Sequence, residues 1–408
     1  MRVGVLRGLS SVVCGLCAAL ALAGCGRAGG IAPVTSATVA ATPTAEATTL
    51  PPTAMPTAVP TQTVTPAAAA SSSAPSPDVA SPDVASPDVT SPMPVPTAAP
   101  SPDIASPDVA SPTPDPYAGL TIDALAGRTY GGGLLEIVET LEQNDRFARY
   151  LIKYPSDGLT VYGFMNVPNE GSRFPVAIVL HGYIDPAGYE VVPYTRRYAD
   201  ALAEAGYFVI HPNFRNYPPS DSGPDPFRIG YAIDVLNLIA IIREQSQDPL
   251  GTLRRADADD INLWGHSMGG GVAQRVLTVN PAPYLRAAVL YGSMSGDEAQ
   301  NYGRIRGWTS DERVRFELGA SPATLAAISP ATYFDRLEAA VAVHHSEADD
   351  VVPVAWSHAL CERLDALSAA GEIPYAPECT FYDLQPHTFR GDGDRRFIEA
   401  TIAFFDRH

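Results

Sequence analysis

The chain has 408 residues and a formal net charge of −18, and its composition changes sharply along its length. Residues 1–25 carry +2 and residues 26–116 carry −6, which leaves −14 on residues 117–408. An acidic domain argues against nucleic acid and anionic lipid surfaces as partners, because both repel negative charge. The charge says little about a substrate.

The first 25 residues predict an export signal. Arg2 and Arg7 precede an apolar run, residues 12–23, that is too short for a comfortable membrane span. The run ends in Leu22-Ala23-Gly24-Cys25, which resembles the lipobox of bacterial lipoproteins. This resemblance implies cleavage before Cys25 and acylation of that cysteine. The alternative is a chance cysteine in an ordinary signal or anchor. We expect an exported, lipid-anchored chain that touches a membrane, at the cell surface or periplasmic face, only through the lipid.

Residues 26–116 predict a disordered linker. They consist largely of Ala, Thr, Ser and Pro, so they cannot bury enough apolar surface to offset the entropy of folding. A Ser-Pro-Asp-Val-Ala unit begins at Ser76 and recurs, with variants, as far as Ser111. We interpret the repeat as a solvated stalk that favours extended polyproline II, and a binding role for it is the alternative.

The apolar pattern predicts an α/β domain over residues 117–408. Runs with near alternation predict an antiparallel lead-in, and continuous apolar runs separated by helix-period segments predict a mostly parallel sheet with helices on both faces. The predicted strands are residues 134–138, 147–152, 159–167, 175–180, 207–210, 261–264, 286–291, 340–345 and 379–383. Residues 293–337 interrupt the alternation, and both a lid and a surface excursion with its own small core remain open.

The segment Gly265-His266-Ser267-Met268-Gly269 follows an apolar strand and begins a helix pattern. This context favours a nucleophile elbow, in which Ser267 occupies a sharp strand-to-helix turn and glycines avoid clashes. The helix start would direct the N–H of Met268 at an oxyanion. A second oxyanion donor is expected after the strand that ends at residue 180, and we assign it to the N–H of Tyr183.

An acid and then a histidine should follow the nucleophile, each after a strand. Asp349 and Asp350 both follow the strand at 340–345, and His387 follows the last strand. His387 is the predicted base, because it comes last in the order Ser, Asp, His. For His181, which stands near the expected site, we favour a structural role.

Cys361 and Cys379 are the two cysteines left after the signal and Cys25 are set aside. An exported chain meets an oxidising compartment, so we predict a disulfide between them, and two free thiols are the alternative.

Together these motifs resemble the dienelactone hydrolase-like and S9 prolyl oligopeptidase catalytic domains of the α/β-hydrolase superfamily, over about residues 147–408. The matching segments are His181-Gly182-Tyr183, Gly265 to Gly269, Ser329-Pro330 with Asp335-Arg336, Asp349 to Pro353, and His387 with Phe389. The spacing to Pro353 in that family favours Asp349 over Asp350. The chain departs from the family at Ser346, where glycine is usual, and at Pro386, where glycine is frequent.

The resemblance implies an α/β-hydrolase fold and a serine hydrolase that cleaves an ester or peptide bond of a small substrate, with no metal or organic cofactor. Gly265 to Gly271 also resemble cutinase-type polyester hydrolases, which keeps a carboxylesterase open. The alternative from another class is an inactive surface-binding protein on the same scaffold. Ester or peptide specificity and oligomeric state stay undetermined.

Overall fold

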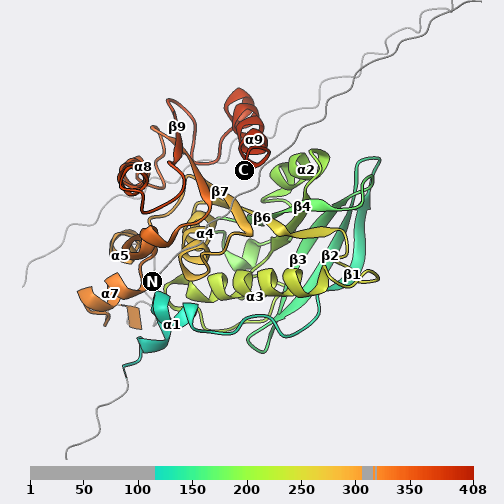
Figure 1. Cartoon of the computed structure of the whole chain (residues 1–408), viewed down its shortest axis with the longest axis horizontal. Coiled ribbons are helices and arrows are strands. Elements are labelled where there is room, and N and C mark those ends of the chain that lie inside the picture. The colour runs from blue at the N-terminus through green and yellow to red at the C-terminus, as the bar shows by residue number, and fades with distance from the viewer. Residues whose placement is uncertain (1–114, 306–315, 318) are drawn as a thin grey trace, which may run out of the picture. The chain divides into compact units, whose positions relative to one another are not determined.

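The computed structural model describes residues 115–305, 316–317 and 319–408 (Figure 1). The predicted signal (1–25), Cys25 and nearly all of the predicted linker (26–116) lie outside the described residues, as does part of the stretch 293–337. Within the described ranges, no helix combines the length and apolar character needed to cross a membrane.

A nine-stranded sheet runs through the described part of the chain in the order β1-β2-β3-β5-β4-β6-β7-β8-β9 (Figure 1). The pairs β1–β2, β2–β3 and β3–β5 are antiparallel, and the remaining pairs, from β5–β4 to β8–β9, are parallel. The strands are β1 (Glu136–Gln143), β2 (Phe147–Ser156), β3 (Leu159–Pro168), β4 (Phe174–Leu180), β5 (Phe208–Pro212), β6 (Ala256–His266), β7 (Leu285–Tyr291), β8 (Ala340–Ser346) and β9 (Glu378–Tyr382). The predicted fold class, a mostly parallel sheet with an antiparallel lead-in, is confirmed.

Helices cover both faces of the sheet. One buried cluster includes side chains of α1, α3, α4 and α8, and a second cluster on the other face includes those of α2 and α9. The helices are η1 (Ala118–Leu120), α1 (Ile122–Ala126), η2 (Pro186–Gly188), α2 (Arg196–Glu204), η3 (Pro226–Arg228), α3 (Ile229–Gln245), α4 (Met268–Val279), α5 (Glu298–Ile305), α7 (Pro322–Ile328), η4 (Pro330–Arg336), α8 (Val354–Ala369) and α9 (Gly391–Phe405).

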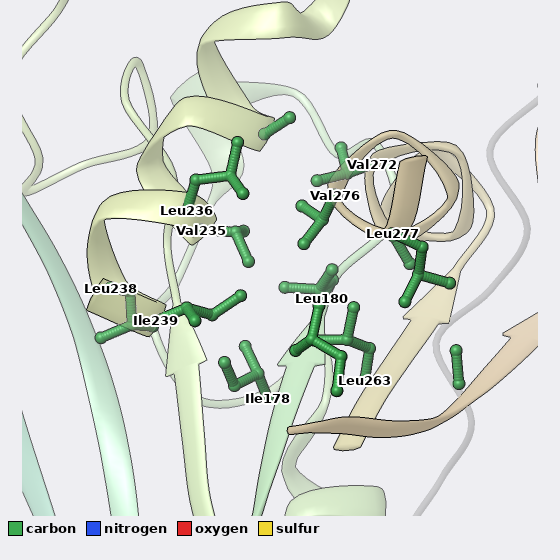
Figure 2. Close-up of a cluster of buried hydrophobic side chains, with 14 of the residues drawn as sticks. Ile178, Leu180, Val235, Leu236, Leu238, Ile239, Leu263, Val272, Val276 and Leu277 are labelled. Atoms are coloured by element: carbon green, nitrogen blue, oxygen red, sulfur yellow. The ribbon is translucent and has the colours of Figure 1, made fainter. Parts of the chain in front are cut away.

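Strand β4 is apolar throughout because both of its faces are covered. Ile178 and Leu180 pack in the cluster that contains α3 and α4 (Figure 2), whereas Ala177 and Val179 belong to the cluster with α2 and α9. Burial of a Leu or Ile side chain stabilises the fold by about 1.5–3 kcal/mol. The central strands therefore form a rigid base for the loops that follow their carboxyl ends.

Some element boundaries differ from the sequence prediction. The first strand covers Glu136–Gln143 rather than residues 134–138, and Leu134 is exposed. This strand lies at the sheet edge with nearly all of its side chains exposed, so burial imposes no alternation on its sequence. Strand β6 begins five residues before the predicted start at Ile261, where two small buried alanines, Ala256 and Ala258, alternate with aspartates and give a weak apolar signal.

The described parts of 293–337 contain α5, α7 and η4, which are held by buried charges. Glu298, at the start of α5, forms ion pairs with Arg228 and Arg275. The Ser329 hydroxyl accepts a hydrogen bond of 2.9 Å from the backbone N–H of Glu298. The two ion pairs compensate the cost of burying the Glu298 carboxylate and fix the start of α5 to the body of the domain. The hydrogen bond links Ser329 to the same point.

Candidate active site

Ser267 occupies a strained turn between β6 and α4. Its backbone angles are φ 55° and ψ −116°, in the region that L-residues rarely adopt. A Cβ on Gly265 would lie 2.5 Å from the carbonyl oxygen of Gly269, and one on Gly269 would lie 2.2 Å from that of Leu180. Both positions therefore require glycine, and the turn has the geometry expected of a nucleophile elbow.

The two expected oxyanion donors belong to backbone segments that reach this turn. Met268 is the first residue of α4, so its N–H belongs to the turn that has no intrahelical acceptor. The loop after β4 reaches Ser267 as well, because a Cβ on Gly182 would lie 3.1 Å from the Cβ of Ser267. Tyr183 follows Gly182 and is 67% exposed. An oxyanion at Ser267 would thus lie close to a helix N-terminus and a second backbone segment.

His387 and Asp349 are in direct contact. The Nδ1 atom of His387 lies 2.7 Å from Oδ2 of Asp349, and the Asp349 side chain is 1% exposed. The other carboxylate oxygen, Oδ1, accepts hydrogen bonds from the N–H groups of Val351 and Val352 at 2.8 and 2.9 Å. Asp350 is exposed. Of the two candidate acids, Asp349 is the one that contacts His387.

The hydrogen bonds to Asp349 determine its charge. Burial by itself would raise the pKa of the Asp349 carboxyl, but hydrogen bonds from His345 and His387 outweigh it and hold the pKa well below its usual range. The carboxylate is therefore ionised at neutral pH, as an acceptor for an imidazolium must be.

His266 connects the serine turn to the His387 loop. Its ring packs on the ring of His387 with centroids 4.6 Å apart, and its Nε2 lies 3.1 Å from the carbonyl oxygen of His387. Its Nδ1 lies 2.8 Å from the hydroxyl of Tyr194. Since Nε2 faces a carbonyl acceptor, it carries the proton, and Nδ1 accepts from Tyr194. Burial and the nearby His387 lower the pKa of His266 well below its usual range, which keeps this ring neutral.

The last link of the expected relay is open in this conformation. Among the described residues, no hydrogen bond joins Oγ of Ser267 to the His387 ring, although His266, the residue before Ser267, contacts that ring. With Nδ1 held by Asp349, the free Nε2 is the atom that would meet the serine hydroxyl. Catalytic hydrogen bonds of this type are frequently long until a substrate is bound.

Sequence reasoning did not find His266, His345 and Ser346 as parts of this site. Ser346 was noted because glycine is usual there, and its hydroxyl is buried between the acid loop and the histidine loop. It donates to the carbonyl of Gln385 at 2.6 Å and accepts from the N–H groups of Ala348 and Gln385, both at 3.1 Å. These contacts depend on the position of Ser346 at the end of β8, next to β9. No local sequence pattern predicts that position.

His181 is a structural residue of the loop after β4. Its ring is fully buried, with Nδ1 2.7 Å from the carbonyl of Gly182 and Nε2 2.8 Å from that of Asn213. Burial lowers the pKa of His181 to about 4. It shapes the loop that leads to Tyr183 and makes no hydrogen bond to Ser267 or Asp349.

Cys361 of α8 and Cys379 of β9 form a disulfide across a separation of 18 residues. The bridge joins the helix after the acid loop to the strand before the histidine loop. It therefore restrains the two segments that bring Asp349 and His387 together.

The alpha/beta hydrolase fold family matches residues 175–380, just over half of the chain. The chain belongs to this family. The match begins in β4 and ends in β9, so it includes the serine turn and the Asp349 loop of this α/β-hydrolase. No curated protein matches the sequence.

Solved structures with a similar fold include two peptidases and an esterase. They are acylaminoacyl peptidase from Pyrococcus horikoshii (20% identity, TM-score 0.50, 65% of this chain and 42% of that one), a putative dipeptidyl aminopeptidase IV from Bacteroides ovatus (15%, 0.51, 65% and 36%) and acetyl xylan esterase from Paenibacillus sp. R4 (16%, 0.49, 70% and 92%). This α/β-hydrolase thus spans less than half of either peptidase chain. At these identities the likeness concerns the fold.

Proposed function

We propose that this α/β-hydrolase is a serine hydrolase that cleaves a carboxylic ester or amide bond through an acyl-enzyme. The hydrogen bond of 2.7 Å between His387 Nδ1 and the ionised Asp349 carries the proposal, because it leaves Nε2 free on a ring that contacts His266, the residue before the strained Ser267. A carboxylate that orients an imidazole near a serine on a strained turn is the arrangement needed to activate a hydroxyl.

In the proposed reaction, Ser267 Oγ attacks the acyl carbonyl carbon while Nε2 of His387 takes its proton. Asp349 stabilises the imidazolium, and the N–H groups of Met268 and Tyr183 donate to the oxyanion. The tetrahedral intermediate then expels the alcohol or amine, which takes the proton from His387. Water, deprotonated by His387, attacks the acyl-enzyme. The second tetrahedral intermediate then releases the acid as His387 returns the proton to Oγ of Ser267.

Fluorophosphonate labelling tests the nucleophile directly. The wild-type chain should be labelled and the Ser267→Ala variant should not. A folded wild type that stays unlabelled and turns over neither substrate class would favour the rival interpretation, an inactive binding protein on this scaffold.

Ester and amide bonds make different demands on the site. An amine is a poor leaving group unless His387 protonates it, whereas an activated alcohol leaves without help, so ester cleavage tolerates a looser relay. The resemblance of Gly265 to Gly271 to cutinase-type enzymes favours an ester, and the resemblance around Asp349 to Pro353 to S9 domains favours a peptide. Parallel assays with p-nitrophenyl acyl esters and aminoacyl-p-nitroanilides separate the two, by kcat/KM.

We also propose that the chain is exported and lipid-anchored through Cys25. The segment Leu22 to Cys25 supports this, and so does the disulfide, because such bonds persist in oxidising compartments. In a bacterial host, Cys25→Ala should abolish incorporation of labelled fatty acid and move the chain from the membrane fraction to the soluble fraction. Unchanged acylation of the variant would refute the anchor.

A further inference from the structure

A second histidine contacts the carboxylate of Asp349. His345 lies on β8 and is fully buried, with Nε2 3.0 Å from Oδ2 of Asp349 and 3.1 Å from the carbonyl oxygen of Val352. Both neighbours are acceptors, so Nε2 carries a proton. The other ring nitrogen, Nδ1, lies 2.7 Å from the hydroxyl of Ser357 on α8, which donates to it when the imidazole is neutral. Ser357 therefore sets the tautomer that presents N–H to Asp349.

With His345, each oxygen of the carboxylate has two donors. Oδ1 accepts from two backbone N–H groups, and Oδ2 accepts from His387 and lies 3.0 Å from Nε2 of His345, whose N–H also meets the carbonyl oxygen of Val352. A carboxylate offers about four acceptor sites, and an N–H group lies close to each of them. Without His345, the one polar partner of Oδ2 among the described residues would be His387. The buried ring of His345 fixes Oδ2 from the β8 side.

We propose that His345 is a positioning residue that holds Asp349 in the orientation needed to align His387. The inference rests on the proposed function, in which His387 alternates between neutral and charged forms while Asp349 must stay in place. His345 exchanges no proton with the substrate and acts only through Asp349. Misplacement of a catalytic group by about 1 Å can cost about 100-fold in rate, so the restraint has a kinetic consequence.

The neighbouring His344 supplies a matched control. It is also buried on β8, but it faces the opposite side of the sheet, where its ring contacts Phe397 and its Nδ1 lies 3.1 Å from the hydroxyl of Tyr382. Its removal perturbs the core to a similar extent without touching Asp349. An effect confined to position 345 therefore reports positioning rather than general loss of packing.

The kinetic test compares His345→Leu, His345→Gln and His344→Leu on a p-nitrophenyl ester, with thermal unfolding of each variant. We expect His345→Leu to lower kcat by about 10- to 100-fold with KM within about twofold. His345→Gln keeps an N–H near the position of Nε2 and should recover kcat to within about fivefold of the wild type. Equal losses of kcat in His344→Leu and His345→Leu, or no recovery by Gln, would overturn the proposal.

A second readout does not depend on turnover. In the proton NMR spectrum of the 15N-labelled protein, the Nδ1–H resonance of His387 should be sharp in the wild type and in His345→Gln and broadened in His345→Leu. If His345→Leu fails to fold, Ser357→Ala, which removes only the tautomer-setting hydroxyl, should broaden the resonance. An unchanged resonance in the folded variants refutes the positioning role. Absent ester and amide turnover with broadening in His345→Leu would instead refute the proposed function alone.

Discussion

Replacement of Ser346 by Ala should loosen the histidine loop by removing one buried hydroxyl. The Ser346 side chain is fully buried, and its hydroxyl serves two N–H donors, those of Ala348 and Gln385, as well as the carbonyl of Gln385. Alanine fits the same space, so the change leaves the packing intact and deletes only these hydrogen bonds.

The structure sets the size of the expected effect. Each buried donor left unsatisfied costs about 1–3 kcal/mol. Ala348 is exposed and water can reach its neighbourhood, so we take the lower end for each of the two N–H groups and expect a loss of about 2–3 kcal/mol in the free energy of unfolding. For a domain of this size the loss corresponds to roughly 4–6 °C in Tm.

Thr401 on α9 offers the matched control, because its hydroxyl is buried and has no hydrogen-bond partner within the described ranges. Thr401→Val removes that hydroxyl at constant shape, and Tm should stay the same or rise. Thermal unfolding by circular dichroism compares the two variants, and ester kcat should fall about 3- to 10-fold only in Ser346→Ala. A Tm for Ser346→Ala within about 1 °C of the wild type would refute the reasoning, because the hydrogen bonds of the hydroxyl to the Ala348 and Gln385 N–H groups would then not stabilise the fold.

Three further predictions follow from the same structure. Gly269→Ala should abolish labelling by a fluorophosphonate or prevent folding, because its Cβ would clash with the backbone of β4, whereas Gly188→Ala, with open space around it, should behave as the wild type. Changing Cys361 and Cys379 to Ser should lower the free energy of unfolding by about 2–3 kcal/mol and make Tm insensitive to reductant, and persistent sensitivity would contradict the bridge. Burial raises the pKa of Asp225 to about 7, so ionising it disfavours the fold and wild-type stability should fall as pH rises from about 4 to about 7. We therefore compare the free energy of unfolding in urea of Asp225→Asn and the wild type at pH 5 and at pH 8. The difference in favour of Asp225→Asn should be larger at pH 8 by roughly 1–3 kcal/mol, and an equal difference at both pH values would contradict this assignment.

The two departures from the S9-like pattern, Ser346 and Pro386, act on the same loop in the structure. Glycine is usual at the position of Ser346 and frequent at that of Pro386, and the two residues lie on segments that meet. Proline restricts the loop before His387, and the Ser346 hydroxyl holds Gln385, the residue before that proline. The loop before His387 is therefore restrained by the Ser346 hydroxyl and the Pro386 ring, at two positions where the family often has flexible glycines.

The sequence by itself determined the fold class and the order of the candidate site. A strand such as β4 can be predicted from the sequence because burial on both faces requires apolar residues along its whole length. Gly265 and Gly269 can be predicted because the strained turn leaves no room for a Cβ. Strand β1 escaped prediction because it is exposed, and the start of β6 escaped it because its buried residues are two small alanines among aspartates.

Tertiary structure alone decided which of two adjacent histidines contacts the acid. His344 and His345 are equivalent in the sequence, but alternation along β8 turns the first toward Phe397 and the second toward Ser357 and Asp349. The same holds for the contact of His266 with His387, 121 residues apart. Local patterns fix which residues form a strand, whereas the pairing of distant strands fixes which side chains meet at its end, because those contacts depend on the register and the order of the whole sheet.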